Sequence, residues 1–272
     1  RERFENEEDS TSIFRPYKTE YERLKKLELS YELQEAFVSE CKKYNLIPTT
    51  TCFNRGNIQA IKNLKLDTIK VASYDCSSLP LIEELSKYFQ KLIISTGATH
   101  DEEIIATANY LKKKKIDFVF LHCVTIYPTP LNEIHLNRMK YLEQFTNNVG
   151  FSEHTNSIKD GTKASLAACY FGAKFIERHF TILDPKETKD GIVSINPKQL
   201  KEIVDFSKLS KTDQKLYLTK NVSEYDIMLG SKYRSLSIEE LKNRDYYRGR
   251  FADHINGNTV YNWEDLDWNE RP

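Results

Sequence analysis

The stretches Phe151-Ser152-Glu153-His154-Thr155 and Phe175-Ile176-Glu177-Arg178-His179-Phe180 each place a histidine at the end of a short apolar run. If the two runs are neighbouring parallel strands, both imidazoles emerge at the same rim of a sheet, where barrel enzymes keep their chemistry. A single histidine at a strand end is more often a hydrogen-bonded structural residue. Two imidazoles beside acidic groups can instead hold a divalent metal with positions left open for substrate.

The charge balance and the cysteine spacing exclude several classes of protein. Lysine plus arginine and aspartate plus glutamate both number 40 in 272 residues, so no basic excess draws the chain to nucleic acid or to an anionic membrane. No apolar run approaches the ~20 residues that span a bilayer, and the polar opening has no signal-peptide core. The 5 cysteines form no CxxC pair and fit reduced thiols. We expect a soluble, cytoplasmic protein.

From residue 31 onward, helix-period stretches alternate with short apolar runs, the pattern of successive βα units on a parallel sheet. The expected strands are residues 46–53, 68–73, 92–96, 118–124, 149–152 and 175–180. The expected helices are residues 31–44, 58–64, 81–88, 101–114, 136–145, 158–171 and 197–209. This spacing suits either a doubly wound sheet or a (βα)8 barrel.

Polar residues at the strand ends favour the barrel. Nearly every run ends in small polar or ionisable residues, and loops that all contribute to one mouth are typical of a barrel, whereas a doubly wound sheet concentrates its site at one switch point. We therefore predict an α/β fold of the (βα)8 TIM-barrel type with six βα units visible, a barrel domain at residues 1–209 and a C-terminal extension or tail at 210–272. The first 30 residues are too polar for strands, so two further strands are expected ahead of Arg1.

Several strand ends carry candidate binding residues. Lys70 lies in an otherwise apolar or small run, so it either holds an anion at the mouth or snorkels beside a helix. Ser95-Thr96-Gly97 can cradle a phosphate or carboxylate with hydroxyl and amide donors, although the acids that follow equally mark helix capping. Prolines hold Tyr127 near the mouth. His122, inside a strand, is expected to be a hydrogen-bonded core residue.

In combination these motifs resemble the sialic acid synthase family. The motifs, in that family's order and spacing, are Lys70-x-x-Ser73, Ser95-Thr96-Gly97, Leu121-His122-Cys123, Tyr127-Pro128-Thr129-Pro130, Gly150-Phe151-Ser152-Glu153-His154-Thr155 and Glu177-Arg178-His179-Phe180-Thr181. The resemblance covers about residues 21–209. Members of that family condense phosphoenolpyruvate with an N-acetylated hexosamine, such as N-acetylmannosamine, on a (βα)8 barrel that uses a divalent metal, commonly Mn²⁺ or Mg²⁺.

The resemblance implies a role for individual residues. It implies His154 and His179 as metal ligands, and Lys70 and Asp75 as catalytic residues. The implied substrate-binding residues are Thr51, Ser73, Ser95, Thr96, Gly97, Thr125, Tyr127, Ser152, Glu177 and Asp190. In the implied reaction the enol carbon attacks the sugar aldehyde, water adds to the resulting oxocarbenium carbon, and phosphate leaves.

The chain departs from the family pattern in three places. Ser73-Tyr74-Asp75 stands where the family usually has Ser-Gly-Glu, which gives a shorter acid after a bulky residue. The family's first two strands have no counterpart, and the tail after Asn243 matches at most the start of the connection to the family's antifreeze-like domain. We expect a homodimeric, phosphoenolpyruvate-condensing transferase. The alternatives are a non-catalytic paralogue or subunit that keeps a sugar or phosphate pocket, and a lyase or aldolase in which Lys70 forms a Schiff base.

Overall fold

One parallel sheet organises the chain in the computed structural model, which describes residues 13, 17–248 and 251–262. Its strands, adjacent in chain order, are β1 (Thr68–Val71), β2 (Lys91–Ser95), β3 (Asp117–Cys123), β4 (Val149–Glu153) and β5 (Ile176–Arg178). The helices between them are α5 (Leu79–Ser86), α6 (Asp101–Lys113), α7 (Arg138–Leu142) and α8 (Lys163–Phe171). Each crossover thus returns the chain to a parallel neighbour, as βα units do.

Further helices precede and follow the sheet. Those before it are α2 (Tyr17–Lys25), α3 (Tyr31–Lys43) and α4 (Ile58–Asn63). Those after it are α9 (Pro197–Ser207), α10 (Lys211–Asn221), α11 (Tyr225–Leu229) and α12 (Ile238–Tyr247), followed by the antiparallel hairpin β6 (Ala252–Ile255) and β7 (Asn258–Tyr261). Short 3₁₀ helices are η1 (Arg55–Asn57), η2 (Ser73–Asp75), η3 (Leu131–Glu133), η4 (Pro185–Glu187) and η5 (Gly191–Val193).

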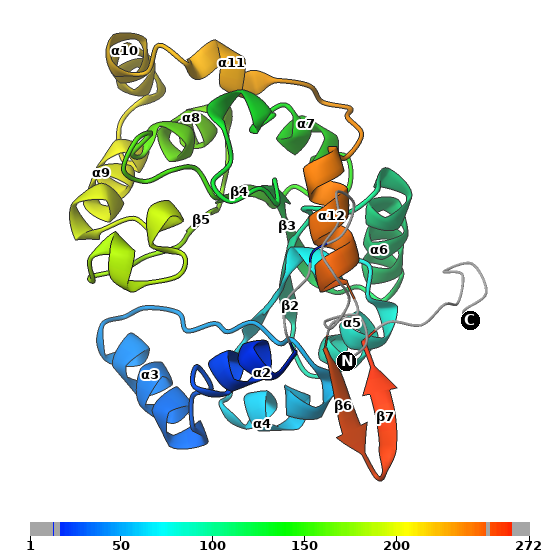
Figure 1. Cartoon of the computed structure of the whole chain (residues 1–272). Helices are drawn as coiled ribbons and strands as arrows, with labels where there is room; N and C mark the ends of the chain where they lie inside the picture. Colours follow the sequence, from blue (N-terminus) through cyan, green and yellow to red (C-terminus); the bar gives the residue numbers. More distant parts are fainter. Residues whose placement is uncertain (1–12, 14–16, 249–250, 263–272) are drawn as a thin grey trace.

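The sheet is strongly curved, with helices on its convex side (Figure 1). β1 and β5 lie at opposite ends of the strand order, yet Lys70 Nζ on β1 is 3.7 Å from Glu177 Oε2 on β5. In a flat sheet of this width the two edge strands would lie about 19 Å apart, at ~4.8 Å per strand. The five strands therefore form a half-barrel whose concave face brings distant strands together.

Both edges of the half-barrel are extended by a single parallel bridge. The expected strand at residues 46–53 is reduced to the bridge between Thr51 and Lys70, because only one side of this segment is paired among the described residues. On the other edge Ile195 forms a bridge with Phe180, a pairing that the sequence did not predict. Within the described part of the chain the strands do not close into a complete eight-stranded barrel.

The expected helices all form, with shifted ends. The largest shift is in α8, which begins at Lys163 instead of residue 158. The Asn156 side chain accepts hydrogen bonds from the amides of Ile158 and Lys159, and Gly161 adopts a φ of +60°. Because the backbone forms these turns, it does not form the first helical turn that the apolar pattern predicted.

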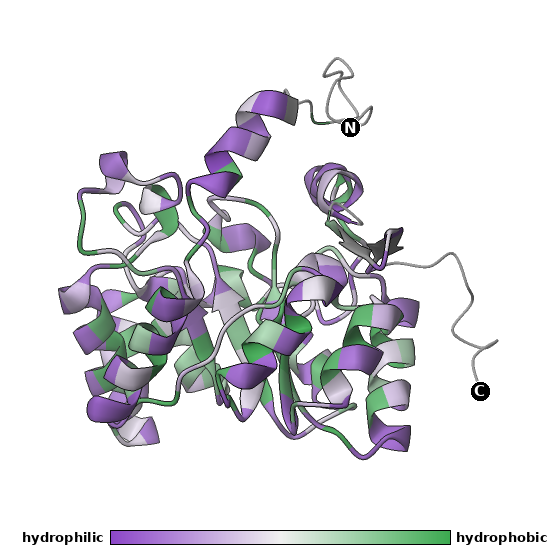
Figure 2. Cartoon of the chain, turned by 90° about the horizontal axis from the view of Figure 1, so that it is seen from below, coloured by the Kyte–Doolittle hydropathy of each residue, from purple (hydrophilic) through white to green (hydrophobic). Residues whose placement is uncertain are grey.

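The core lies between the sheet and the helices. Ile69, Val71, Leu92 and Ile94 alternate along β1 and β2 and are fully buried. Figure 2 shows apolar residues gathered on the inner elements and polar residues on the outer faces of the helices. Burial of each such side chain contributes roughly 1.5–3 kcal/mol. Because the apolar side of each strand faces the helices, the alternate residues are left to line the concave face.

The chain beyond residue 209 packs back on the sheet-bearing part. Lys211 Nζ donates to the carbonyls of Cys169 and Tyr170 at 3.2 and 2.8 Å, at the end of α8. Residues 263–272 of the expected tail lie outside the described residues, and the domain boundary at 209 stays a prediction. No helix in the described ranges has the length and apolar character needed to cross a bilayer.

Candidate active site

The register of β4 and β5 sets which side chains reach the concave face. Ser152 pairs with Glu177, and Ser152 Oγ donates to Glu177 Oε1 at 2.7 Å. Lys70 Nζ approaches the other oxygen of Glu177 and also donates to the Val71 carbonyl at 3.0 Å. Lys70 is only 8% exposed. The lysine therefore points into the half-barrel and does not snorkel along its outside, and its role in holding an anion stays a prediction.

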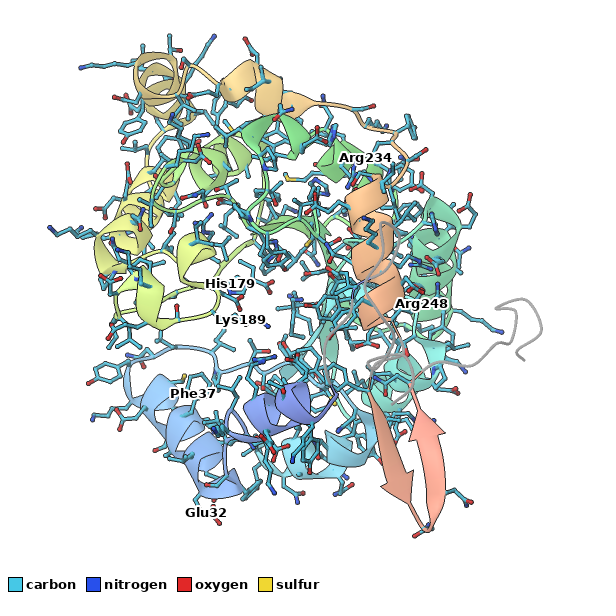
Figure 3. The ribbon with its side chains drawn as sticks, in the orientation of Figure 1. Glu32, Phe37, His179, Lys189, Arg234 and Arg248 are labelled. Atoms are coloured by element: carbon cyan, nitrogen blue, oxygen red, sulfur yellow. The ribbon has the colours of Figure 1, made fainter. Side chains whose placement is uncertain are left out.

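His154 and His179 come together at the carboxyl ends of β4 and β5, as their matched settings predicted. Their ring centroids are 5.2 Å apart. The Tyr127 hydroxyl lies 2.8 Å from His154 Nε2, and the Asp190 carboxylate lies 3.9 Å from His179 Nδ1. Figure 3 shows His179 on the concave side of the half-barrel. Four of the predicted site residues thus form one cluster.

Both imidazoles are held in the neutral form. Burial lowers the pKa of His154 well below its usual value, and the nearby His179 and Lys70 lower it further. Burial also lowers the pKa of His179, while the carboxylates of Asp190 and Glu177 act in the opposite direction. His154 Nδ1 lies 3.8 Å from Cys123 Sγ at the end of β3, and Nε2 faces the Tyr127 hydroxyl.

A second cluster forms where the loops after β1, β2 and β3 converge. The Gly97 amide donates to Ser73 Oγ at 3.2 Å. A Cβ at Gly97 would lie 2.6 Å from Thr125 Cγ2, so no larger residue fits without displacing this neighbour. Ser95 Oγ is buried and has no hydrogen-bond partner among the described residues. An unsatisfied buried hydroxyl can donate to a bound anion.

The remaining predicted residues occupy different settings. Thr51 is the bridge partner of Lys70, so the two residues lie side by side. Thr96 Oγ1 donates to the Leu121 carbonyl at 3.1 Å, so its hydroxyl proton is engaged in a hydrogen bond to β3. Asp75 is buried in η2, and its Oδ1 accepts from Asn262 Nδ2 at 3.4 Å. The roles of all three in binding or catalysis stay predictions.

Two structural features near the site were not predicted. α12 lies along the rim of the sheet, where Asn243 Nδ2 donates to the Thr125 carbonyl and Arg244 donates to the Ala98 carbonyl, both at 2.6 Å. Behind the histidines, Glu153 and Arg178 form a buried ion pair. His122, by contrast, is the core residue expected, since its Nε2 lies 2.6 Å from the Ile134 carbonyl.

The histidine cluster fits part of the coordination shell of a divalent cation. Neutral imidazoles at this separation can supply two nitrogen ligands. Among the described residues, no group of three or more histidine, cysteine, aspartate or glutamate side chains is arranged to hold a metal. His154 and His179 are thus two candidate nitrogen ligands, and the binding of a metal by them stays a prediction.

Comparison with known proteins identifies the family. The chain matches the NeuB family over residues 2–216. It is 34% identical over 182 residues to N,N'-diacetyllegionaminic acid synthase of Campylobacter jejuni, covering 65% of this chain and 53% of that protein. It is 28% identical over 189 residues to N-acetylneuraminate-9-phosphate synthase of Drosophila melanogaster, covering 68% and 50%. The chain thus spans about half the length of these curated relatives.

A solved structure shows the same architecture. The crystal structure of the spore coat polysaccharide biosynthesis protein SpsE from Bacillus subtilis matches with a TM-score of 0.68 at 26% identity, covering 80% of this chain and 60% of that chain. Together with the sequence matches, this confirms the resemblance that the strand-end motifs predicted. The chain belongs to the NeuB family.

Proposed function

We propose that this protein condenses phosphoenolpyruvate with an N-acetylated hexosamine, N-acetylmannosamine or a related sugar, to give a nonulosonic (sialic-type) acid and phosphate. The observation that carries the proposal is the convergence of Lys70, Glu177 and two neutral histidines on one concave face. The relatives named as legionaminic acid and N-acetylneuraminate-9-phosphate synthases support the same class of reaction.

The phosphoenolpyruvate end of the site is built from β1, β2 and β4. The Lys70 ammonium supplies a buried positive charge, and a hydrogen bond from a charged group contributes about 1.5–3 kcal/mol. The unsatisfied Ser95 hydroxyl adds a neutral donor, the Gly97 amide holds the Ser73 hydroxyl in place, and Thr51, Thr96 and Ser152 are the further candidate contacts. These residues bind and orient the anion and hold its enol carbon toward the histidine cluster.

The sugar end is built from β5 and from the loops after β3 and β5. Tyr127, Thr125, Glu177 and Asp190 present hydroxyl and carboxylate groups that can bind sugar hydroxyls. A divalent cation, Mn²⁺ or Mg²⁺, held by His154 and His179 would polarise the aldehyde of the open-chain sugar. The neutral imidazoles avoid placing positive charge against such a cation.

In the proposed reaction, C3 of phosphoenolpyruvate forms a carbon–carbon bond with the aldehyde carbon. The resulting cation at C2 takes up water, and the tetrahedral intermediate collapses to a ketone as phosphate leaves with the bridging oxygen. An acidic side chain near C2 stabilises the developing charge and orients the water. Asp75 is the candidate for that role by its position after Ser73.

Two alternatives lead to different expectations. One observation favours a non-catalytic paralogue. Asp75, the candidate for orienting the water, accepts a hydrogen bond from Asn262, so this carboxylate oxygen already has a partner in the protein. A Schiff-base mechanism needs a neutral lysine, whereas Lys70 is paired with Glu177. Borohydride trapping with pyruvate should therefore leave Lys70 unmodified. A cytoplasmic location and a homodimer stay predictions.

The test is a product assay with purified protein. Phosphoenolpyruvate and N-acetylmannosamine are incubated with chelator-treated protein, with and without added Mn²⁺, and the keto acid is detected by mass spectrometry. We expect product that depends on Mn²⁺ and that is lost in His154→Ala and in His179→Ala, each with an unchanged circular dichroism spectrum. Product formation at the wild-type rate in either variant would contradict the assignment of the histidines.

A further inference from the structure

An ion pair lies directly behind the two histidines, on the helix side of the sheet. Glu153 of β4 and Arg178 of β5 are register partners, and their side chains are in contact. The side chains are 0% and 4% exposed, respectively. Consecutive residues of a strand face opposite sides of the sheet. The pair therefore faces α8, while His154 and His179, the next residue in each chain segment, face the concave side.

Both members of the pair have further partners. The Glu153 carboxylate accepts hydrogen bonds from the hydroxyl of Thr155 and from that of Ser165 on α8. The Arg178 guanidinium also donates to Thr155 Oγ1 and to the Val193 carbonyl, each at 3.4 Å. The network thus connects β4, β5, α8 and the η5 turn.

The connection to η5 reaches a third residue of the site. Val193 is the last residue of η5, and the residue that precedes this helix is Asp190. The Asp190 carboxylate is the group that lies 3.9 Å from His179 Nδ1. Arg178, which directly precedes His179, is thus also bonded to the turn that follows Asp190.

Strand β5 needs such support. It has three residues, and beyond it the ladder continues only through the bridge between Phe180 and Ile195 among the described residues. A buried ion pair adds little net stability, because the desolvation of two charges offsets their attraction. It does fix one relative arrangement, since a displaced strand would leave buried charges without partners.

We propose that Glu153 and Arg178 are positioning residues that hold His154 and His179 at the separation required by a divalent cation. This inference rests on the proposed function, since the cation is part of it. Partners that hydrogen-bond a metal ligand typically change metal affinity about 10–100-fold when they are mutated, and Glu153 and Arg178, which act through the backbone, are expected at the lower end of that range.

The experiment measures metal binding without turnover. Arg178→Lys keeps the charge but loses the planar fork that bonds several partners, and Glu153→Gln keeps the shape but loses the charge. Metal binding is followed by titration with Co²⁺, through its visible absorption band, and with Mn²⁺, by electron paramagnetic resonance. We expect both variants to bind each ion about tenfold more weakly or worse, with a shifted Co²⁺ band.

A matched control separates positioning from stability. Arg234 and Glu240 form another buried pair, with two contacts of 2.6 and 2.7 Å, and the Glu240 side chain is 1% exposed. Figure 3 places Arg234 well away from His179. Arg234→Lys and Glu240→Gln should lower the melting temperature by a similar amount. They should leave the Co²⁺ band and both metal affinities unchanged.

A milder variant keeps the test decisive if the charge variants do not fold. Ser165→Ala removes a single hydroxyl behind Glu153 and places a good helix former in α8. We expect a smaller loss of metal affinity and a detectable change in the Co²⁺ band. A Ser165→Ala protein that binds both ions as the wild type does would overturn the proposal in that case.

The outcomes distinguish this proposal from the proposed function. If the wild type binds metal and forms product, but the Glu153 and Arg178 variants match their controls in affinity and spectrum, only the positioning role is overturned. If the wild type binds neither ion, the metal-assisted part of the proposed function fails, and the positioning role fails with it.

Discussion

Replacement of Gly97 by alanine tests the close packing of the three strand ends that carry the proposed phosphoenolpyruvate-binding residues. The added Cβ would lie 2.6 Å from Thr125 Cγ2 and 2.9 Å from both Cys123 Sγ and Ser73 Oγ. All three neighbours are buried, with Cys123 and Thr125 at the end of β3 and Ser73 in η2, so the movement of one side chain does not relieve every close contact. Overpacking of this kind costs about 1–3 kcal/mol.

The variant should lose both stability and anion affinity. For a chain of this size, each kcal/mol lowers the melting temperature by roughly 2–4 °C. The displacement also breaks the hydrogen bond from the Gly97 amide to Ser73 Oγ. If one hydrogen bond to the phosphoenolpyruvate anion is lost, at about 1.5–3 kcal/mol, the dissociation constant rises about 10–150-fold. Calorimetric titration with phosphoenolpyruvate and a thermal melt measure the two effects.

A second substitution provides the internal control. Thr125→Ser removes Cγ2, the atom nearest to the added Cβ. The double variant Gly97→Ala/Thr125→Ser should recover part of the stability that Gly97→Ala loses, because residues in contact are not additive. A Gly97→Ala protein with the melting temperature and phosphoenolpyruvate affinity of the wild type would refute the packing argument.

Three further predictions concern single side chains. Lys70→Met should weaken phosphoenolpyruvate binding at least tenfold, because a charged hydrogen bond contributes about 1.5–3 kcal/mol. The control Lys91→Met removes a lysine paired with Asp117 at 3.4 Å and should bind phosphoenolpyruvate as the wild type does; equal affinities of the two variants would contradict the role of Lys70. Burial lowers the pKa of His122 to about 3, so stability falls as pH drops from 6.5 toward 3, by about 2 kcal/mol at pH 5. In denaturant titrations across this pH range, His122→Gln should lose less stability than the wild type. Equal losses in the two proteins would refute the assignment to His122. Tyr127→Phe should lower kcat/KM about 2–10-fold and leave the affinity for phosphoenolpyruvate unchanged. An unaltered kcat/KM would show that the Tyr127 hydroxyl has no role in the reaction.

Strand alternation explains why much of the site was predictable. His154 and His179 directly follow β4 and β5, which are neighbours in the sheet, so their equivalent positions after the two strands place both at the same rim. The parallel order of β1 to β5 followed from regular spacing of apolar runs. The segment 46–53 shows the limit of that reasoning, because an apolar run becomes a strand only where a partner pairs its backbone.

Other features depended on contacts that no local pattern encodes. Asn243 reaches Thr125 across 118 positions of the sequence, so the placement of α12 on the rim has no signal in spacing. Glu153 and Arg178 each look like a residue for the solvent face of a strand. Here the helices cover that face, so the two charges are buried against each other.

The most direct test of the proposed function follows the bridging oxygen of phosphoenolpyruvate. The substrate is labelled with ¹⁸O between C2 and phosphorus and is incubated with the protein, N-acetylmannosamine and Mn²⁺. Condensation followed by collapse of the tetrahedral intermediate breaks the C2–O bond, so all of the label should appear in phosphate, in equal amount to a nonulosonic acid. Label retained in pyruvate, or bound phosphoenolpyruvate that releases no phosphate, would contradict the proposed function.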